Sequence, residues 1–227
     1  MSLLRFDNVG KRYASGRDAL VDVSFDVAPG ECVAITGPAG SGRTTLLHIV
    51  ATLVQPTSGT LTIGGIDTST HLYDARRRLA YADDVCAAGS GLRVAEYLRW
   101  ILHTRGDGAS IEHTRRVRDA LAAGAIDSAI PVDSLESAQR LLVSVAAALM
   151  VRPDVLVVDG RACASTPARS FFLDCVSDAL VRRAALVVLA DDVTALDGLR
   201  ARELRVEGGR LASDGMLRDA SAAMEHV

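Results

Sequence analysis

Lysine is nearly missing from this chain of 227 residues: Lys11 is the only one, and all other basic residues are arginine. Long apolar runs are lacking too, since no stretch reaches the roughly 18 apolar residues that a membrane-spanning helix needs. The first residues do not resemble a signal peptide. We therefore expect no transmembrane segment in this chain, so any role at a membrane requires a partner.

Paired cysteines are missing as well. Cys32, Cys86, Cys163 and Cys175 lie far apart and form no CxxC pair, which argues against a zinc site or a disulfide scaffold and favours a reducing cytosol. The net charge is −3 at pH 7, and no stretch clusters basic residues with aromatic ones. Nucleic-acid binding is therefore not expected.

What the chain does have is the composition of a globular domain, with 49% hydrophobic and 23% charged residues. Apolar and polar residues alternate at strand period over 4–9 and 20–27, which predicts an antiparallel β piece. A buried strand over 32–36 follows, then a glycine-rich loop, then a helical run over 44–53. A short strand over 60–63 would complete the antiparallel piece.

The second half of the chain predicts a helical insertion followed by more strands. Residues 94–149 have helical spacing and include a charged helix over 111–122. Apolar strands return over 155–158 and 185–190, separated by a helix over about 168–182. This βαβ order predicts a doubly wound α/β core with a parallel sheet.

The glycine-rich loop carries the most specific motif. It fits the phosphate-binding pattern GxxxxGK[ST] at every defined position, except that Arg43 stands where lysine is expected. Glycines let successive backbone N–H groups turn toward phosphate oxygens, and the following helix offers its positive N-terminus. Thr44 can place its hydroxyl on Mg²⁺. The predicted phosphate-binding residues are Gly37, Pro38, Ala39, Gly40, Ser41, Gly42, Arg43, Thr44 and Thr45.

Further segments stand in a fixed order around this loop, namely Tyr13, Pro56–Gly59, Leu92–Leu98 and Arg152–Asp159. Across the whole chain, this order resembles the nucleotide-binding subunit of an ABC transporter. The resemblance implies a P-loop NTPase (RecA-like) parallel-sheet core with an N-terminal antiparallel β subdomain and a helical subdomain insertion. It further implies one ATP-binding cassette over residues 1–227, with the helical subdomain at roughly 85–150.

In that family two cassettes sandwich two ATP molecules, each held between one phosphate loop and the partner's signature helix. The resemblance implies that Tyr13 stacks on adenine, although an ordinary aromatic at a β edge is the alternative interpretation. It also implies that Asp159 holds Mg²⁺ through water, beside Thr44. The implied cofactors are thus ATP and Mg²⁺. The implied partners are a membrane permease subunit and a second, catalytically competent cassette, with the chain cytoplasmic at the inner face of the cell membrane.

Four positions depart from the family's catalytic pattern. Arg43 replaces a compact lysine with a bulky planar fork, which predicts weaker ATP binding. Gly160 follows Asp159 where the family has the glutamate that orients the attacking water, and losing a general base costs on the order of 10²–10⁴-fold in rate. Asp191 stands at the family's switch histidine, and Asp84 stands at the glutamine of its Q-loop.

The family's signature LSGGQ is replaced by Leu135-Glu136-Ser137-Ala138-Gln139. The Cβ atoms of Ser137 and Ala138 would crowd the bare N–H groups with which the family holds the partner's γ-phosphate. Glu136 has a simpler interpretation, because an acid in the first turn stabilises a helix. The D-loop, similar to Ser-Gly-Leu-Asp in the family, is replaced by Cys163-Ala164-Ser165-Thr166, which removes a carboxylate.

These departures lead to the hypothesis of a degenerate cassette subunit in an ABC-type membrane transport complex. Such a subunit would bind nucleotide weakly or structurally, with impaired or absent hydrolysis, and would act in assembly or regulation. One alternative is a working ATPase in which Asp84, Asp191 or Asp192 supplies the missing carboxylate. The other is a nucleotide-free scaffold whose fold presents a docking surface.

Overall fold

The computed structural model describes residues 2–86, 90–105, 121, 126–161, 166–191 and 193–217. Its strands are β1 (Leu4–Arg12), β2 (Asp18–Val27), β3 (Cys32–Thr36), β4 (Ser58–Ile63), β5 (Ile66–Asp67), β6 (Leu79–Ala82), β7 (Val155–Asp159), β8 (Ala185–Leu189), β9 (Ala201–Glu207) and β10 (Arg210–Met216). Its helices are α1 (Arg43–Val50), α2 (Leu72–Arg77), α3 (Val94–Arg105), α5 (Ser137–Met150) and α6 (Thr166–Val181), with 3-10 turns η2 (Val132–Ser134) and η4 (Val193–Leu196).

Four strands near the N-terminus form an antiparallel sheet in the order β2-β1-β4-β5. Side chains alternate along β1, where Leu4 and Phe6 are buried while Arg5 and Asp7 are exposed. Phe6 stacks on Phe25 of β2 with ring centroids 4.6 Å apart. The antiparallel β piece expected from strand-period alternation is therefore confirmed.

The second sheet holds six strands in the order β10-β9-β3-β8-β7-β6. Neighbours from β9 to β6 pair in parallel, and β10 pairs antiparallel with β9. Strands β3, β7 and β8 are buried at every residue, as expected for central strands that are covered on both faces. Strands β6, β9 and β10 did not stand out in the sequence, because β6 has only 4 residues and β10 is largely exposed.

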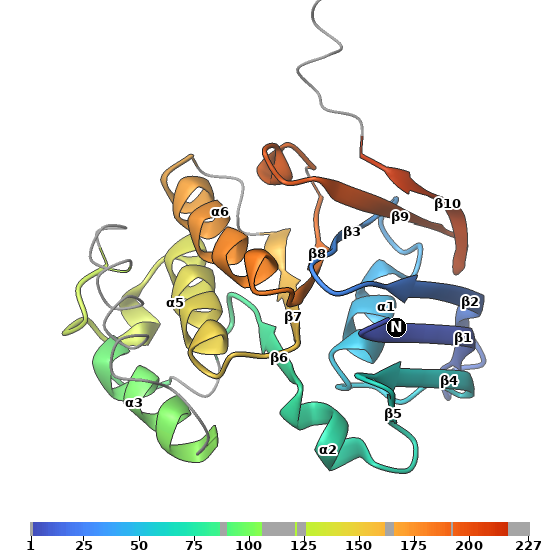
Figure 1. The fold of residues 1–227 in the computed structure, drawn as a ribbon, viewed down its shortest axis with the longest axis horizontal. Coiled ribbons are helices and arrows are strands. Elements are labelled where there is room, and N and C mark those ends of the chain that lie inside the picture. Colours follow the sequence, from blue (N-terminus) through green and yellow to red (C-terminus); the bar gives the residue numbers. More distant parts are fainter. Residues whose placement is uncertain are drawn as a thin grey trace, which may run out of the picture.

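Alternate side chains of β3 point into two separate hydrophobic clusters. Val33 and Ile35 pack with α1 and the antiparallel sheet, whereas Cys32 and Ala34 pack with α5 and α6. Figure 1 shows α1 between the two sheets and α5 and α6 on the opposite side of the six-stranded sheet. The doubly wound α/β core predicted from the sequence is confirmed.

The helical part of the chain is described in α3 and α5, which pack against each other. The charged helix predicted over 111–122 lies outside the described residues, apart from Leu121. Helix α1 ends at Val50, earlier than the predicted end at residue 53, because Thr52 adopts a positive φ of 58°. In the described parts of the chain no helix is long and apolar enough to cross a bilayer.

Candidate nucleotide site

The carboxyl ends of β3, β8, β7 and β6 meet at one edge of the six-stranded sheet. Ile35 and Asp159 both pair with Leu189 of β8, and Ala82 of β6 pairs with Val158 of β7. The loops that follow these strands therefore begin at the same level, where ligands bind in open α/β sheets. This register brings together the predicted phosphate loop, Asp84, Gly160 and Asp191.

The loop between β3 and α1 has a backbone that requires glycine. The φ angle is 134° at Gly37, 76° at Gly40 and 110° at Gly42. A Cβ on Gly37 would lie 2.1 Å from the carbonyl oxygen of Val206, and one on Gly42 would lie 2.4 Å from that of Ala19. Glycine is needed here for both backbone conformation and space, as the phosphate-loop motif predicted.

The start of α1 is suited to an anion. Gly42 is the N-cap residue, no side chain caps the helix, and its first turn contains no acid. The first N–H groups are therefore available to phosphate oxygens. Residues 38–40 and Thr44 are exposed, while the buried hydroxyl of Ser41 has no hydrogen-bond partner among the described residues. These features fit the phosphate chain of a nucleotide.

Tyr13 follows β1 directly and reaches the same helix start. Its hydroxyl lies 3.3 Å from Oγ1 of Thr45, and Nζ of Lys11 lies 5.4 Å from its ring centroid. A cavity of about 150 Å³ between this tyrosine and the phosphate loop is also lined by Arg17, whose Nη2 donates to the carbonyl oxygen of Gly40 at 2.8 Å. An aromatic ring beside an uncapped helix start suits a base and its attached phosphates.

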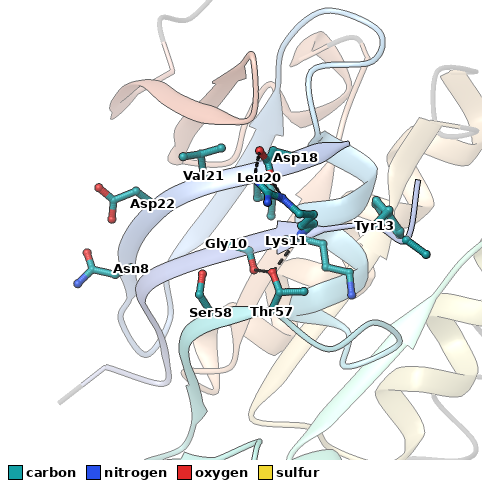
Figure 2. Close-up of a pocket in the computed structure, with 12 residues that line it drawn as sticks. Asn8, Gly10, Lys11, Tyr13, Asp18, Leu20, Val21, Asp22, Thr57 and Ser58 are labelled. Carbon is teal, nitrogen blue, oxygen red and sulfur yellow. Dashed lines mark hydrogen bonds and ion pairs between the residues drawn. The ribbon is translucent and has the colours of Figure 1, made fainter. Parts of the chain in front are cut away.

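A larger cavity of about 690 Å³ lies over β1 and β2 (Figure 2). Within it Arg12 holds Asp18 at 2.6 and 2.8 Å, and the hydroxyl of Thr57 donates to the carbonyl oxygen of Gly10 at 3.1 Å. Of the predicted site residues it contains only Tyr13, at one edge of the group in Figure 2. The phosphate loop is therefore the stronger candidate site.

Arg43 and Asp191, two of the departures from the family pattern, contact each other. Nη1 of Arg43 donates to Oδ1 of Asp191 at 2.6 Å, with the arginine side chain 16% and the aspartate side chain 56% exposed. The Arg43 guanidinium, which the motif predicts to contact phosphates, is thus turned toward Asp191, just after β8. The acid predicted to stand at the family's histidine position thus pairs with the arginine that stands at the lysine position of the motif.

Asp159 at the end of β7 is held by Arg161, which the sequence analysis did not single out. Nε of Arg161 donates to Oδ1 of Asp159 at 2.7 Å, and Nη2 donates to Oδ2 at 2.5 Å. The hydrogen bonding to Asp159 raises the pKa of Arg161, against an opposing effect of desolvation, and the charges of Asp191 and Asp84 act in the same direction as Asp159. Arg161 therefore lies within electrostatic reach of three carboxylates.

The two residues predicted to hold Mg²⁺ do not fit a metal ion in this arrangement. Thr44 is exposed, but both carboxylate oxygens of Asp159 are engaged by a guanidinium. Within the described ranges, no group of three or more His, Cys, Asp or Glu side chains is placed to hold a metal. Mg²⁺ at Thr44 and Asp159 thus stays a prediction, in which the ion would have to share the Asp159 carboxylate with Arg161.

Gly160, predicted to stand at the position of the family's glutamate, is closely packed. A Cβ there would lie 2.7 Å from Cγ1 of Val188 and 3.0 Å from the carbonyl oxygen of Leu189. Valine in a strand is stiff at χ1, so it cannot easily move aside. Strand β8 therefore leaves little room for a side chain at position 160.

The side chain of Asp83 accepts hydrogen bonds from the backbone of the loop after β6. Its Oδ1 accepts the N–H groups of Val85 at 3.2 Å and Cys86 at 3.1 Å. Arg140 of α5 donates from Nε to the backbone oxygen of Asp84 at 2.7 Å. The Asp84 carboxylate, predicted to replace the family's glutamine, lies near enough to affect Arg161.

The signature segment forms the start of α5. Glu136 is the N-cap residue, and its N–H donates to Oε1 of Gln139 at 3.1 Å, which supports the interpretation of Glu136 as helix-start chemistry. Arg140 donates from Nη2 to Oγ of Ser137 at 3.0 Å and from Nη1 to the backbone oxygen of Leu135. Arg140 therefore joins the signature segment to the loop after β6.

Arg17, Arg140 and Arg161 were not predicted as site residues, although the last two stand beside a motif. Arg161 stands two places after Asp159, and Arg140 comes directly after the signature segment. Asp192 and the replaced D-loop as far as residue 165 lie outside the described residues, so their predicted roles stay predictions.

A parallel sheet with a glycine-rich phosphate loop between β3 and α1 defines a P-loop nucleotide-binding protein. The family model described as ABC transporter matches residues 20–161. The chain is 30% identical over 184 residues to "Phosphonates import ATP-binding protein PhnC 2" of Synechococcus sp., covering 74% of this chain and 67% of that protein. It is 30% identical over 228 residues to "Phosphonates import ATP-binding protein PhnC 1" of Rhodopseudomonas palustris, covering 94% and 81%. The chain therefore belongs to the ABC transporter family of ATP-binding subunits.

The fold agrees with that membership. The structure superposes on one described as "Structure of ATP binding subunit of ABC transporter" with a TM-score of 0.83, covering 99% of this chain and 94% of that chain. At 20% sequence identity this likeness bears on the fold alone. It confirms the predicted P-loop α/β architecture with an antiparallel β sheet and helices.

Proposed function

We propose that this chain is an ATP-binding cassette subunit of a membrane transport complex that binds nucleotide without turning it over. The observation that carries the proposal is the position after Asp159, where Gly160 is packed against Val188 and Leu189. A general base cannot be supplied from that position, and its loss alone costs on the order of 10²–10⁴-fold in rate. The phosphate loop, in contrast, keeps its glycines and its uncapped helix start.

Nucleotide binding and hydrolysis use different groups in this site. The backbone N–H groups from Gly40 to Thr44 would hold the phosphates, and Tyr13 would stack on the adenine. None of these groups depends on the replaced catalytic side chains. Because Arg43 is drawn toward Asp191, the phosphates would gain little from that side chain, which supports weak binding.

The proposed partners are a membrane permease subunit and a second, catalytically competent cassette, with this chain at the inner face of the membrane. The two phosphonate import proteins that it resembles support a transport complex. In such a complex the chain would act in assembly or regulation.

The test is the affinity for ATP, measured by calorimetry on the purified wild type and on Tyr13→Ala. Loss of base stacking, about 1–3 kcal/mol, predicts a fall in affinity of roughly 5- to 150-fold. Tyr73→Ala is the matched control, because Tyr73 is 73% exposed on α2 and lines neither described cavity. It should leave the affinity unchanged.

Three other results would redirect the assignment. Equal affinity of the wild type and Tyr13→Ala would remove Tyr13 from the base site. No binding even at millimolar ATP would favour the nucleotide-free scaffold. Release of phosphate during the titration would favour a working ATPase that uses Asp84, Asp191 or Asp192.

A further inference from the structure

The carboxyl group of Asp159 lies in a place that water hardly reaches. Its side chain is 8% exposed at the end of a strand that is buried at every residue. An ionised carboxylate in such a place needs a cation or several donors. Arg161 provides both, since its Nε and Nη2 contact the two carboxylate oxygens at 2.7 and 2.5 Å.

The cation beside Asp159 is therefore part of the chain. A guanidinium is always charged, and its planar fork matches a carboxylate in two places, which a single lysine could not do. The Arg161 side chain is 49% exposed, so it has donors left over on the open side of the pair. Guanidinium donors of this kind also bind phosphate oxygens.

We propose that Arg161 replaces Mg²⁺ in this cassette, so that Asp159 binds no divalent cation and phosphate groups on the loop before α1 are bound without one. The part about phosphate rests on the proposed nucleotide binding. The part about Asp159 does not, because the pair with Arg161 is formed by the protein alone. The two parts therefore have separate tests.

The first test is thermal unfolding of the nucleotide-free protein in excess MgCl₂ and in EDTA. The wild type should give the same Tm in both. Arg161→Ala should lower Tm in EDTA by about 3–8 °C, because Asp159 is left buried and unpaired, and MgCl₂ should restore most of that loss. The double variant Arg161→Ala with Asp159→Asn should not respond to MgCl₂. Arg182→Ala is the matched control, since Arg182 pairs with Asp178 on the surface of α6.

The second test is the dissociation constant for ATP under the same two conditions. It should agree within about twofold for the wild type, whereas Arg161→Ala should bind more tightly with MgCl₂ than with EDTA. A wild-type Tm that rises with MgCl₂, an Arg161→Ala variant with the wild-type Tm, or wild-type ATP affinity that depends tenfold on MgCl₂ would overturn the proposal. No ATP binding under either condition would contradict the proposed function, while the unfolding data would still decide whether Arg161 replaces the metal.

Discussion

Single residues of the candidate site are held in two ion pairs. Arg43 and Asp191 each differ from the family pattern, and they contact each other at 2.6 Å. Gly160, predicted to stand at the position of the family's glutamate, has no carboxylate, and Arg161 next to it holds Asp159. Removing one partner of a buried ion pair is costly, so Arg161 stabilises the buried Asp159, whereas Asp191 is more than half exposed.

Gly160→Glu should not restore hydrolysis. The new Cβ would press on Val188 and on the carbonyl oxygen of Leu189, so we expect the free energy of unfolding to fall by about 1–3 kcal/mol. Urea unfolding measures the loss, and phosphate release measures turnover. Gly215→Glu is the control, because a Cβ on Gly215 would have no described atom within 4 Å.

Adding Val188→Ala to Gly160→Glu separates the steric effect from the chemical one. The smaller side chain relieves the closest contact, so the double variant should lose less stability to the new glutamate than the single variant does. Phosphate release should stay at background, because Asp191 remains paired with Arg43. Phosphate release above background in either variant would show that the missing glutamate alone prevents hydrolysis.

At the scale of elements, Arg140 connects the start of α5 to the loop after β6. Arg140→Ala would leave the backbone oxygens of Leu135 and Asp84 and the hydroxyl of Ser137 without this donor. We expect the free energy of unfolding to fall by about 2–4 kcal/mol. Arg99→Ala, which removes one exposed bond to Ala95 within α3, should change it by less than about 0.5 kcal/mol, and equal effects of the two variants would contradict this role.

The elements also show how far the sequence could predict the molecule. Strand β3, the phosphate loop and α1 were predictable because a short apolar run, a glycine motif and helical spacing follow in order. Strand β10 was not predictable, because six of its seven residues are exposed and only Leu211 is partly buried, so its burial does not alternate. The positions of the site residues followed from the motifs. Their contacts did not, since the pair of Arg43 and Asp191 joins residues 148 apart in the sequence.

At the scale of the whole molecule, ATP should not drive two copies of this chain into a closed dimer. Each phosphate loop would face the partner copy's signature segment, where Glu136 and the Cβ atoms of Ser137 and Ala138 replace bare donors. Light scattering with and without Mg-ATP should give the same mass. A shift from monomer to dimer on adding ATP would contradict this prediction.

Restoring the signature provides a sharper version of the same experiment. The triple variant Glu136→Ser, Ser137→Gly and Ala138→Gly recreates the family sequence at the start of α5. Dimerisation should still not follow, because Arg43 stays paired with Asp191 and Arg161 with Asp159. An ATP-dependent dimer in this variant alone would show that the signature is the sole obstacle to closure.

Phosphate release from Mg-ATP, by the wild type and by Asp159→Ala at equal concentration, tests whether this cassette turns ATP over. We expect the same background rate for both proteins, because Gly160 supplies no base and Asp159 is held by Arg161. A wild-type rate clearly above that of Asp159→Ala would contradict this expectation and would assign the missing role to another carboxylate of the chain.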